Sequence, residues 1–84
     1  MIDLKILSTP GCAPCKVVEG IAAKLQQEFK DLQVETIDLM EHPDFAVEYE
    51  VMSSPTVVIN GKVAFVGAVN EDQLREKMEE VRQQ

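Results

Sequence analysis

The order of hydrophobic and polar residues predicts alternating strands and helices in the first half of the chain. Residues 2–7 alternate and then become continuously apolar, which is typical of a strand in a covered sheet. After a turn-rich loop at residues 8–11, helical spacing predicts a helix whose buried residues are Val18, Ile21, Ala22, Leu25 and Phe29. Residues 32–39 return to period two. The intervening helix favours a parallel pairing of the two strands in a right-handed βαβ unit.

The second half of the chain predicts a short helix followed by a hairpin. His42-Pro43-Asp44 resembles a helix start, because proline at a first-turn position lacks an N–H that would be unpaired anyway. This helix is expected to end near Tyr49. Residues 56–59 and 63–66 are β-branched and aromatic, and Asn60-Gly61 between them favours a type I′ turn.

A last helix is predicted after Asn70, which can cap it together with Gln73, and its buried stripe is Leu74, Met78 and Val81. The element order is therefore βαβαββα, an α/β arrangement with a four-stranded mixed sheet flanked by helices. Met40 and Met52 flank the second helix, where they could line the edge of a substrate groove, but we expect both to fill gaps in the core.

Composition narrows the class of protein. A chain of 84 residues with 45% apolar and 27% charged residues is expected to form one domain over residues 1–84. No apolar run approaches the ~20 residues that span a bilayer, and the start lacks a basic signal-peptide region, so a cytoplasmic location is expected. The net charge of −7 without a basic cluster makes nucleic acid and membranes poor partners.

The two cysteines, Cys12 and Cys15, lie three positions apart where a loop enters the predicted helix. Unpaired N–H groups and the helix dipole at this end favour a thiolate on the first sulfur. Cys12 is therefore the predicted nucleophile. Cys15, one turn later, is placed to resolve a mixed disulfide. Between them, Pro14 stiffens the loop, and the small side chain of Ala13 leaves access to the site open.

Two further interpretations of the cysteine pair remain open from the residues alone. Both side chains could be buried hydrophobic residues of a helix. They could also bind zinc or bridge an iron-sulfur cluster between two chains, although zinc needs four ligands and His42 is the only histidine. We expect no metal site.

Several short segments along the chain resemble those of the thioredoxin and glutaredoxin superfamily. Residues 12–16, Cys-Ala-Pro-Cys-Lys, are similar to the thioredoxin active-site loop, and residues 53–56, Ser-Ser-Pro-Thr, to the segment with its cis-proline. Residues 66–74 are similar to the passage between the last strand and last helix. The resemblance covers essentially the whole chain and implies a minimal thioredoxin fold.

The resemblance also implies roles for residues around the cysteines. Pro55 would be the cis-proline facing the disulfide, and Ser54 would offer its backbone to a bound peptide. Gly67 would let a substrate approach closely, and Lys16 would add positive potential. Gly11, Ala13 and Pro14 would complete the substrate-binding loop. From the residues alone there are alternatives: Pro55 could instead be a trans proline at a strand start, Gly67 a strand terminator and Lys16 merely solvated.

The chain departs from a full thioredoxin in three respects. Gly11 replaces the usual tryptophan before the first cysteine, and Ile6 replaces a buried aspartate that assists proton transfer. The chain also lacks the extra N-terminal strand and helix. It resembles the short thioredoxin-glutaredoxin hybrids of archaea and some bacteria.

These features predict a monomeric thiol-disulfide oxidoreductase that reduces protein disulfides. Its redox-active disulfide would be Cys12–Cys15, without any cofactor, and a flavoprotein of the thioredoxin-reductase type would be the electron donor. Glutathione is the alternative donor, but Glu71 and Asp72 at the last helix would repel its carboxylates. Two competing functions are a glutathione-dependent glutaredoxin and a non-catalytic module that binds peptide or metal.

Overall fold

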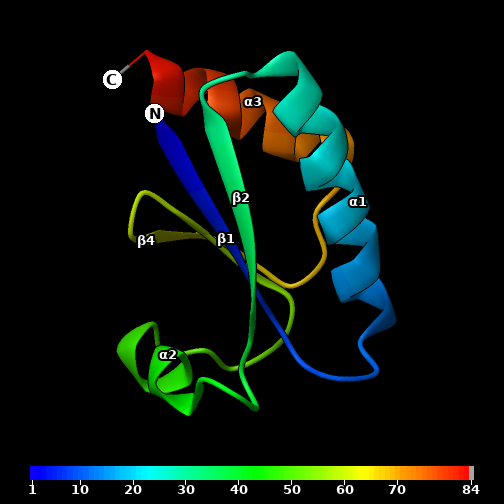
Figure 1. Cartoon of the computed structure of the whole chain (residues 1–84), viewed down its shortest axis with the longest axis vertical. Helices are drawn as coiled ribbons and strands as arrows, with labels where there is room; N and C mark the ends of the chain where they lie inside the picture. The colour runs from blue at the N-terminus through cyan, green and yellow to red at the C-terminus, as the bar shows by residue number, and fades with distance from the viewer. Residues whose placement is uncertain (84) are drawn as a thin grey trace.

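A computed structural model describes residues 1–83, and it has the predicted element order βαβαββα (Figure 1). The elements are β1 (Ile2–Ser8), α1 (Ala13–Glu28), β2 (Leu32–Asp38), α2 (Pro43–Glu48), β3 (Thr56–Ile59), β4 (Lys62–Val66) and α3 (Glu71–Arg82). The expected boundaries are met within one or two residues. No helix in this part of the chain is long and apolar enough to cross a membrane.

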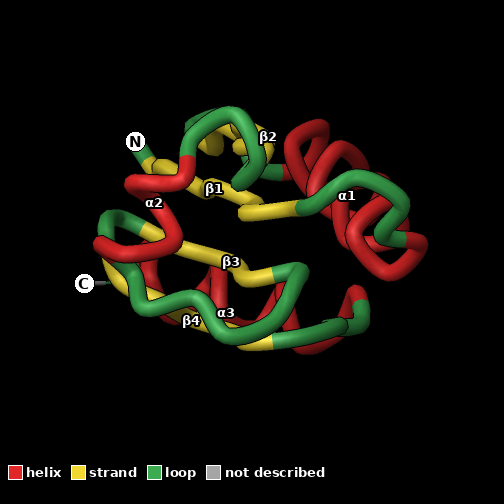
Figure 2. Tube along the Cα trace, turned by 90° about the horizontal axis from the view of Figure 1, so that it is seen from below, coloured by secondary structure: helices red, strands yellow, loops and turns green. Residues whose placement is uncertain are grey.

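The four strands form one mixed sheet in the order β2-β1-β3-β4, with β1 between β2 and β3 (Figure 2). Strands β1 and β2 are parallel, which confirms the βαβ unit. Strand β3 runs antiparallel to both β1 and β4. The carboxyl end of β1 and the amino end of β3 therefore lie at the same edge of the sheet.

Helices cover the two faces of the sheet unequally (Figure 1). Helices α1 and α3 pack on one face over the larger core, which includes Leu4, Ile6, Val18, Leu25, Val57, Leu74 and Met78. The short α2 covers part of the opposite face, where Phe45 and Tyr49 pack against a smaller cluster of Leu7, Ile37 and Val58. Strand β3 is buried along its whole length, which explains its continuous apolar run. Strand β1 alternates between buried and partly exposed residues until Ile6 and Leu7, which are both buried.

Two local predictions are confirmed in backbone detail. Asn60 and Gly61 both have positive φ, 51° and 82°, as the tight turn between β3 and β4 requires. At α3 the side chain of Asn70 accepts from the Gln73 N–H at 2.8 Å, while the Gln73 side chain accepts from the Asn70 N–H at 3.0 Å. This reciprocal cap satisfies two N–H groups at the start of the helix.

The prediction that Met40 and Met52 fill the core is wrong. Met40 is 72% exposed and Met52 is 94% exposed. Both lie in connecting segments, where side-chain direction follows no helical or strand period. Val51 packs against the cluster beneath α2, while its neighbour Met52 is exposed.

Candidate active site

The register between β1 and β3 determines which residues meet at the sheet edge that carries the site. Leu7 lies opposite Thr56 at the last paired position. Continuing the same register places Thr9, two residues after Leu7, opposite Ser54, two residues before Thr56. Their hydroxyl oxygens lie 3.0 Å apart, so the approach of the two segments continues past the strands.

The pairing of β3 with β4 brings Gly67 to the same edge. Thr56 lies opposite Val66, and in the next position the Gly67 N–H donates to the Pro55 carbonyl at 2.7 Å. Gly67 has a φ of 90°, a conformation that favours glycine. The Ser54–Pro55 peptide bond is cis, and Pro55 is buried.

The cysteine pair lies at the amino end of α1. Cys12 is the residue that caps this helix, and its Sγ accepts from the Cys15 N–H at 3.1 Å. The two sulfur atoms form a disulfide, with the Cα atoms 5.3 Å apart. Cys15 is 2% exposed, whereas Cys12 is half-buried. An incoming group therefore reaches Cys12 first.

A hydroxyl group also contacts the disulfide from the cis-proline segment. The Ser54 hydroxyl donates to Cys12 Sγ at 3.8 Å and is itself bonded to Thr9. Sequence reasoning assigned Ser54 only a backbone role and did not single out Thr9. The signal was available in the β1–β3 pairing, but only once the register was known.

A cavity of about 230 Å³ lies beside the disulfide and is lined by Ser8, Thr9, Pro10, Gly11, Cys12, Cys15, Lys16, Glu19 and Asp38. It contains the predicted Gly11 and Lys16, and the exposed Ala13 and Pro14 lie between the cysteines. Glu19 and Asp38 bring carboxylates that sequence reasoning missed. Ile6 is fully buried. The acidic groups that line this cavity therefore come from α1 and β2.

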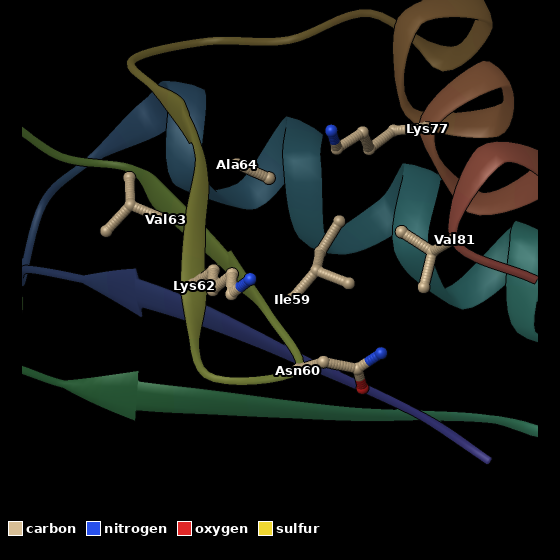
Figure 3. A pocket seen from close by; sticks show the side chains of 7 residues that line it. All are labelled: Ile59, Asn60, Lys62, Val63, Ala64, Lys77 and Val81. Atoms are coloured by element: carbon tan, nitrogen blue, oxygen red, sulfur yellow. The ribbon is translucent and has the colours of Figure 1, made fainter. Parts of the chain in front are cut away.

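A larger cavity of about 450 Å³ lies away from the cysteines, between the β3–β4 hairpin and α3 (Figure 3). Its lining includes the apolar side chains of Ile59, Ala64 and Val81, with Lys62 from the hairpin and Lys77 from α3. It contains no thiol, so redox chemistry belongs to the smaller cavity. Within residues 1–83, no cluster of three or more histidine, cysteine or acidic side chains is arranged to hold a metal ion.

Cations near the start of α3 are engaged in ion pairs. Lys24 and Arg75 each lie 3.0 Å from the Glu71 carboxylate, and Arg75 also binds Glu28. The hydrogen bond from Lys24, followed by that from Arg75, holds the pKa of Glu71 below its ordinary value. These contacts join α1 to α3 and occupy the positive charges in this region.

Known proteins with the same architecture match along nearly the whole chain. The sequence model of a family described as "Thioredoxin domain" matches residues 2–79. A thioredoxin of Methanocaldococcus jannaschii is 36% identical over 76 residues, which cover 89% of each chain. A probable thioredoxin of Methanothermobacter thermautotrophicus is 34% identical over 77 residues, covering 90% of this chain and 91% of that relative.

A solved structure gives the same result in three dimensions. The oxidised form of mitochondrial thioredoxin 3 from Saccharomyces cerevisiae superposes with a TM-score of 0.80 at 29% sequence identity. The match covers 94% of this chain and 77% of the yeast chain.

Proposed function

Because the chain belongs to the thioredoxin family and is a thiol-disulfide oxidoreductase, we propose that it reduces protein disulfides, with Cys12 as nucleophile and Cys15 as resolving thiol. The observation that supports this assignment is the difference in exposure and position between the two cysteines. Cys12 is the more exposed and sits at the helix terminus, while Cys15 is buried behind it.

The proposed reaction consists of two exchanges. The Cys12 thiolate attacks one sulfur of a substrate disulfide, forming a mixed disulfide and releasing the other substrate sulfur as a thiolate. Cys15 then loses its proton and attacks Cys12 Sγ, which releases the second substrate thiolate and forms the Cys12–Cys15 bond. The substrate gains the two electrons that the chain loses. The Cys15 proton protonates one released thiolate, and the other takes from solvent a proton equivalent to the one that Cys12 had given up when it ionised.

The surroundings of Cys12 favour the first exchange. The Cys15 N–H already points at Cys12 Sγ, and the first turn of α1 contains no acidic residue. Both features stabilise negative charge on this sulfur. A substrate would lie across Gly11, Ala13 and Pro14 on one side and Ser54, Pro55 and Gly67 on the other. Lys16 would add positive potential from the edge of the cysteine cavity.

A protein reductase fits the site better as electron donor than glutathione does. Glutathione carries two carboxylates, which a dedicated site would match with cations or free helix N–H groups. Lys24 and Arg75 are already paired with carboxylates, and Asn70 and Gln73 cap the start of α3. We therefore propose a flavoprotein of the thioredoxin-reductase type as the electron donor. A monomeric chain and a cytoplasmic location remain part of the proposal as expected from the sequence.

Steady-state reduction of insulin tests both the activity and the donor. The chain should reduce insulin when a thioredoxin-reductase system supplies electrons, and it should reduce a small mixed disulfide only slowly when glutathione supplies them. Cys12→Ser is the control and should be inactive with either donor. Efficient turnover by glutathione with none by the reductase would indicate a glutathione-dependent glutaredoxin instead. An active Cys12→Ser variant would show that Cys12 is not the nucleophile.

A further inference from the structure

We propose that the side chains of Thr9 and Ser54, called here the hydroxyl pair, form a directed hydrogen-bond chain that ends on Cys12 Sγ and stabilises its thiolate. The inference rests on the proposed function, in which Cys12 attacks. It assigns Ser54 a role through its side chain, beyond the backbone role expected of the residue before the cis-proline. It also makes Thr9 a positioning residue.

The direction of the chain follows from the number of available protons. A serine hydroxyl has one hydrogen to donate. Ser54 donates it to Cys12 Sγ at 3.8 Å, so Thr9 must donate in the 3.0 Å contact between the two hydroxyl oxygens. The bond from Thr9 then holds the Ser54 oxygen in place and leaves its hydrogen directed at the sulfur.

The backbone holds Thr9 and Ser54 in position independently of their side chains. Thr9 follows β1 and accepts from the Cys12 N–H through its carbonyl at 3.3 Å. Ser54 precedes buried Pro55 and Thr56, and Thr56 pairs with Leu7 of β1. Both hydroxyl groups therefore lie on short, anchored segments, with Ser54 in contact with Cys12 Sγ and Thr9 in contact with Ser54.

The hydrogen-bond chain should favour the reduced state over the oxidised state. A disulfide sulfur is a weak acceptor, and the 3.8 Å contact in the oxidised form is correspondingly long. A thiolate carries a full charge, and hydrogen bonds to charged groups are about twice as strong as neutral ones. Ser54 and Thr9 thus contribute more after reduction, which raises the thiolate fraction and makes the Cys12–Cys15 disulfide easier to reduce.

Titration of the Cys12 thiolate by ultraviolet absorbance tests this directly. In a Cys15→Ser background Cys12 is the only thiol of the chain. At pH values below the titration midpoint, Ser54→Ala and Thr9→Val should each lower the fraction of Cys12 that is ionised. For Ser54→Ala the decrease should be about tenfold, which corresponds to the loss of one hydrogen bond to a charged group. Thr9→Ser keeps the hydroxyl and should titrate like the parent.

Two substitutions away from the sulfur serve as matched controls. Ser53→Ala removes an exposed hydroxyl one residue before Ser54, and Thr36→Val removes an exposed hydroxyl on β2. Neither should move the titration. In the chain with both cysteines, Ser54→Ala should also shift the equilibrium with a glutathione buffer toward the disulfide by up to about tenfold, or ~30 mV.

Unchanged titrations of Ser54→Ala and Thr9→Val in folded protein would overturn the proposal. So would a Thr9→Ser variant that titrates like Thr9→Val, because the hydroxyl would then not be the active group. Failure of the proposed function has a different signature: Cys12 would titrate but would form no mixed disulfide with a substrate, in the parent as in every variant.

Discussion

Cys12 and Cys15 share one helix terminus but differ in surroundings. Cys12 Sγ accepts from a backbone N–H and from the Ser54 hydroxyl, while Cys15 packs into the protein with 2% of its surface exposed. Donors stabilise a thiolate, and burial disfavours one. These different surroundings support the proposed roles of Cys12 as the attacking sulfur and Cys15 as the resolving sulfur.

Exposure of single residues also leads to a stability prediction. Met78, on the inner face of α3, is fully buried, whereas Met52 is 94% exposed. The same substitution should have different consequences at the two positions. Met78→Ala should lower the free energy of unfolding by about 2–5 kcal/mol, because it leaves a cavity in the core. Met52→Ala should change it by less than about 0.5 kcal/mol.

Denaturant unfolding of both variants measures these differences. A loss above about 1 kcal/mol for Met52→Ala would mean that its side chain is packed against the protein after all.

Among the elements, α1 and α3 are joined by ion pairs in addition to their shared core. Glu71, in the first turn of α3, lies 3.0 Å from both Lys24 of α1 and Arg75 of α3. Since the hydrogen bond from Lys24 comes first among the causes that lower the pKa of Glu71, the contact favours the ionised carboxylate in the folded state.

The sign of the pH dependence follows from that lowered pKa. The stabilisation by Glu71 is fully present above the pKa of the unfolded chain, about 4.3, and is lost as the pH falls through the lower pKa of the folded chain. Glu71→Gln should therefore unfold more readily than the parent near neutral pH. The difference should disappear in acid.

Unfolding free energies measured across this pH range give the test, with Glu76→Gln on the exposed face of the same helix as control. Glu76 takes part in none of the ion pairs of residues 1–83, so its substitution should show no such pH dependence. A Glu71→Gln deficit that persists in strong acid would show that the effect does not come from the carboxylate charge.

For the molecule as a whole, the fold could be predicted from the sequence because the local sequence patterns all indicate the same arrangement of strands and helices. The alternation in residues 2–7, the Asn60-Gly61 turn and the Asn70–Gln73 cap each specify one local geometry, and those geometries are compatible with one mixed sheet. The two cysteines were found because their spacing and position at a helix start favour redox chemistry over a buried or metal-binding pair.

What escaped sequence reasoning depends on contacts between distant segments. Thr9 and Ser54 are 45 positions apart, and only the register of β1 against β3 brings their hydroxyl groups together. Glu19 and Asp38 reach the cysteine cavity from different elements. Met40 and Met52 were misplaced because a connecting segment has no period that would show which side chains face inward.

Mass spectrometry of the complex trapped with a protein disulfide tests the central claim most directly, namely that Cys12 attacks and Cys15 resolves. The Cys15→Ser variant, once reduced and mixed with insulin, should accumulate a mixed disulfide whose linking peptide contains Cys12. The Cys12→Ser variant should accumulate little, because Cys15 is buried. Trapping through Cys15 in Cys12→Ser, with none through Cys12 in Cys15→Ser, would contradict the assignment of the two roles.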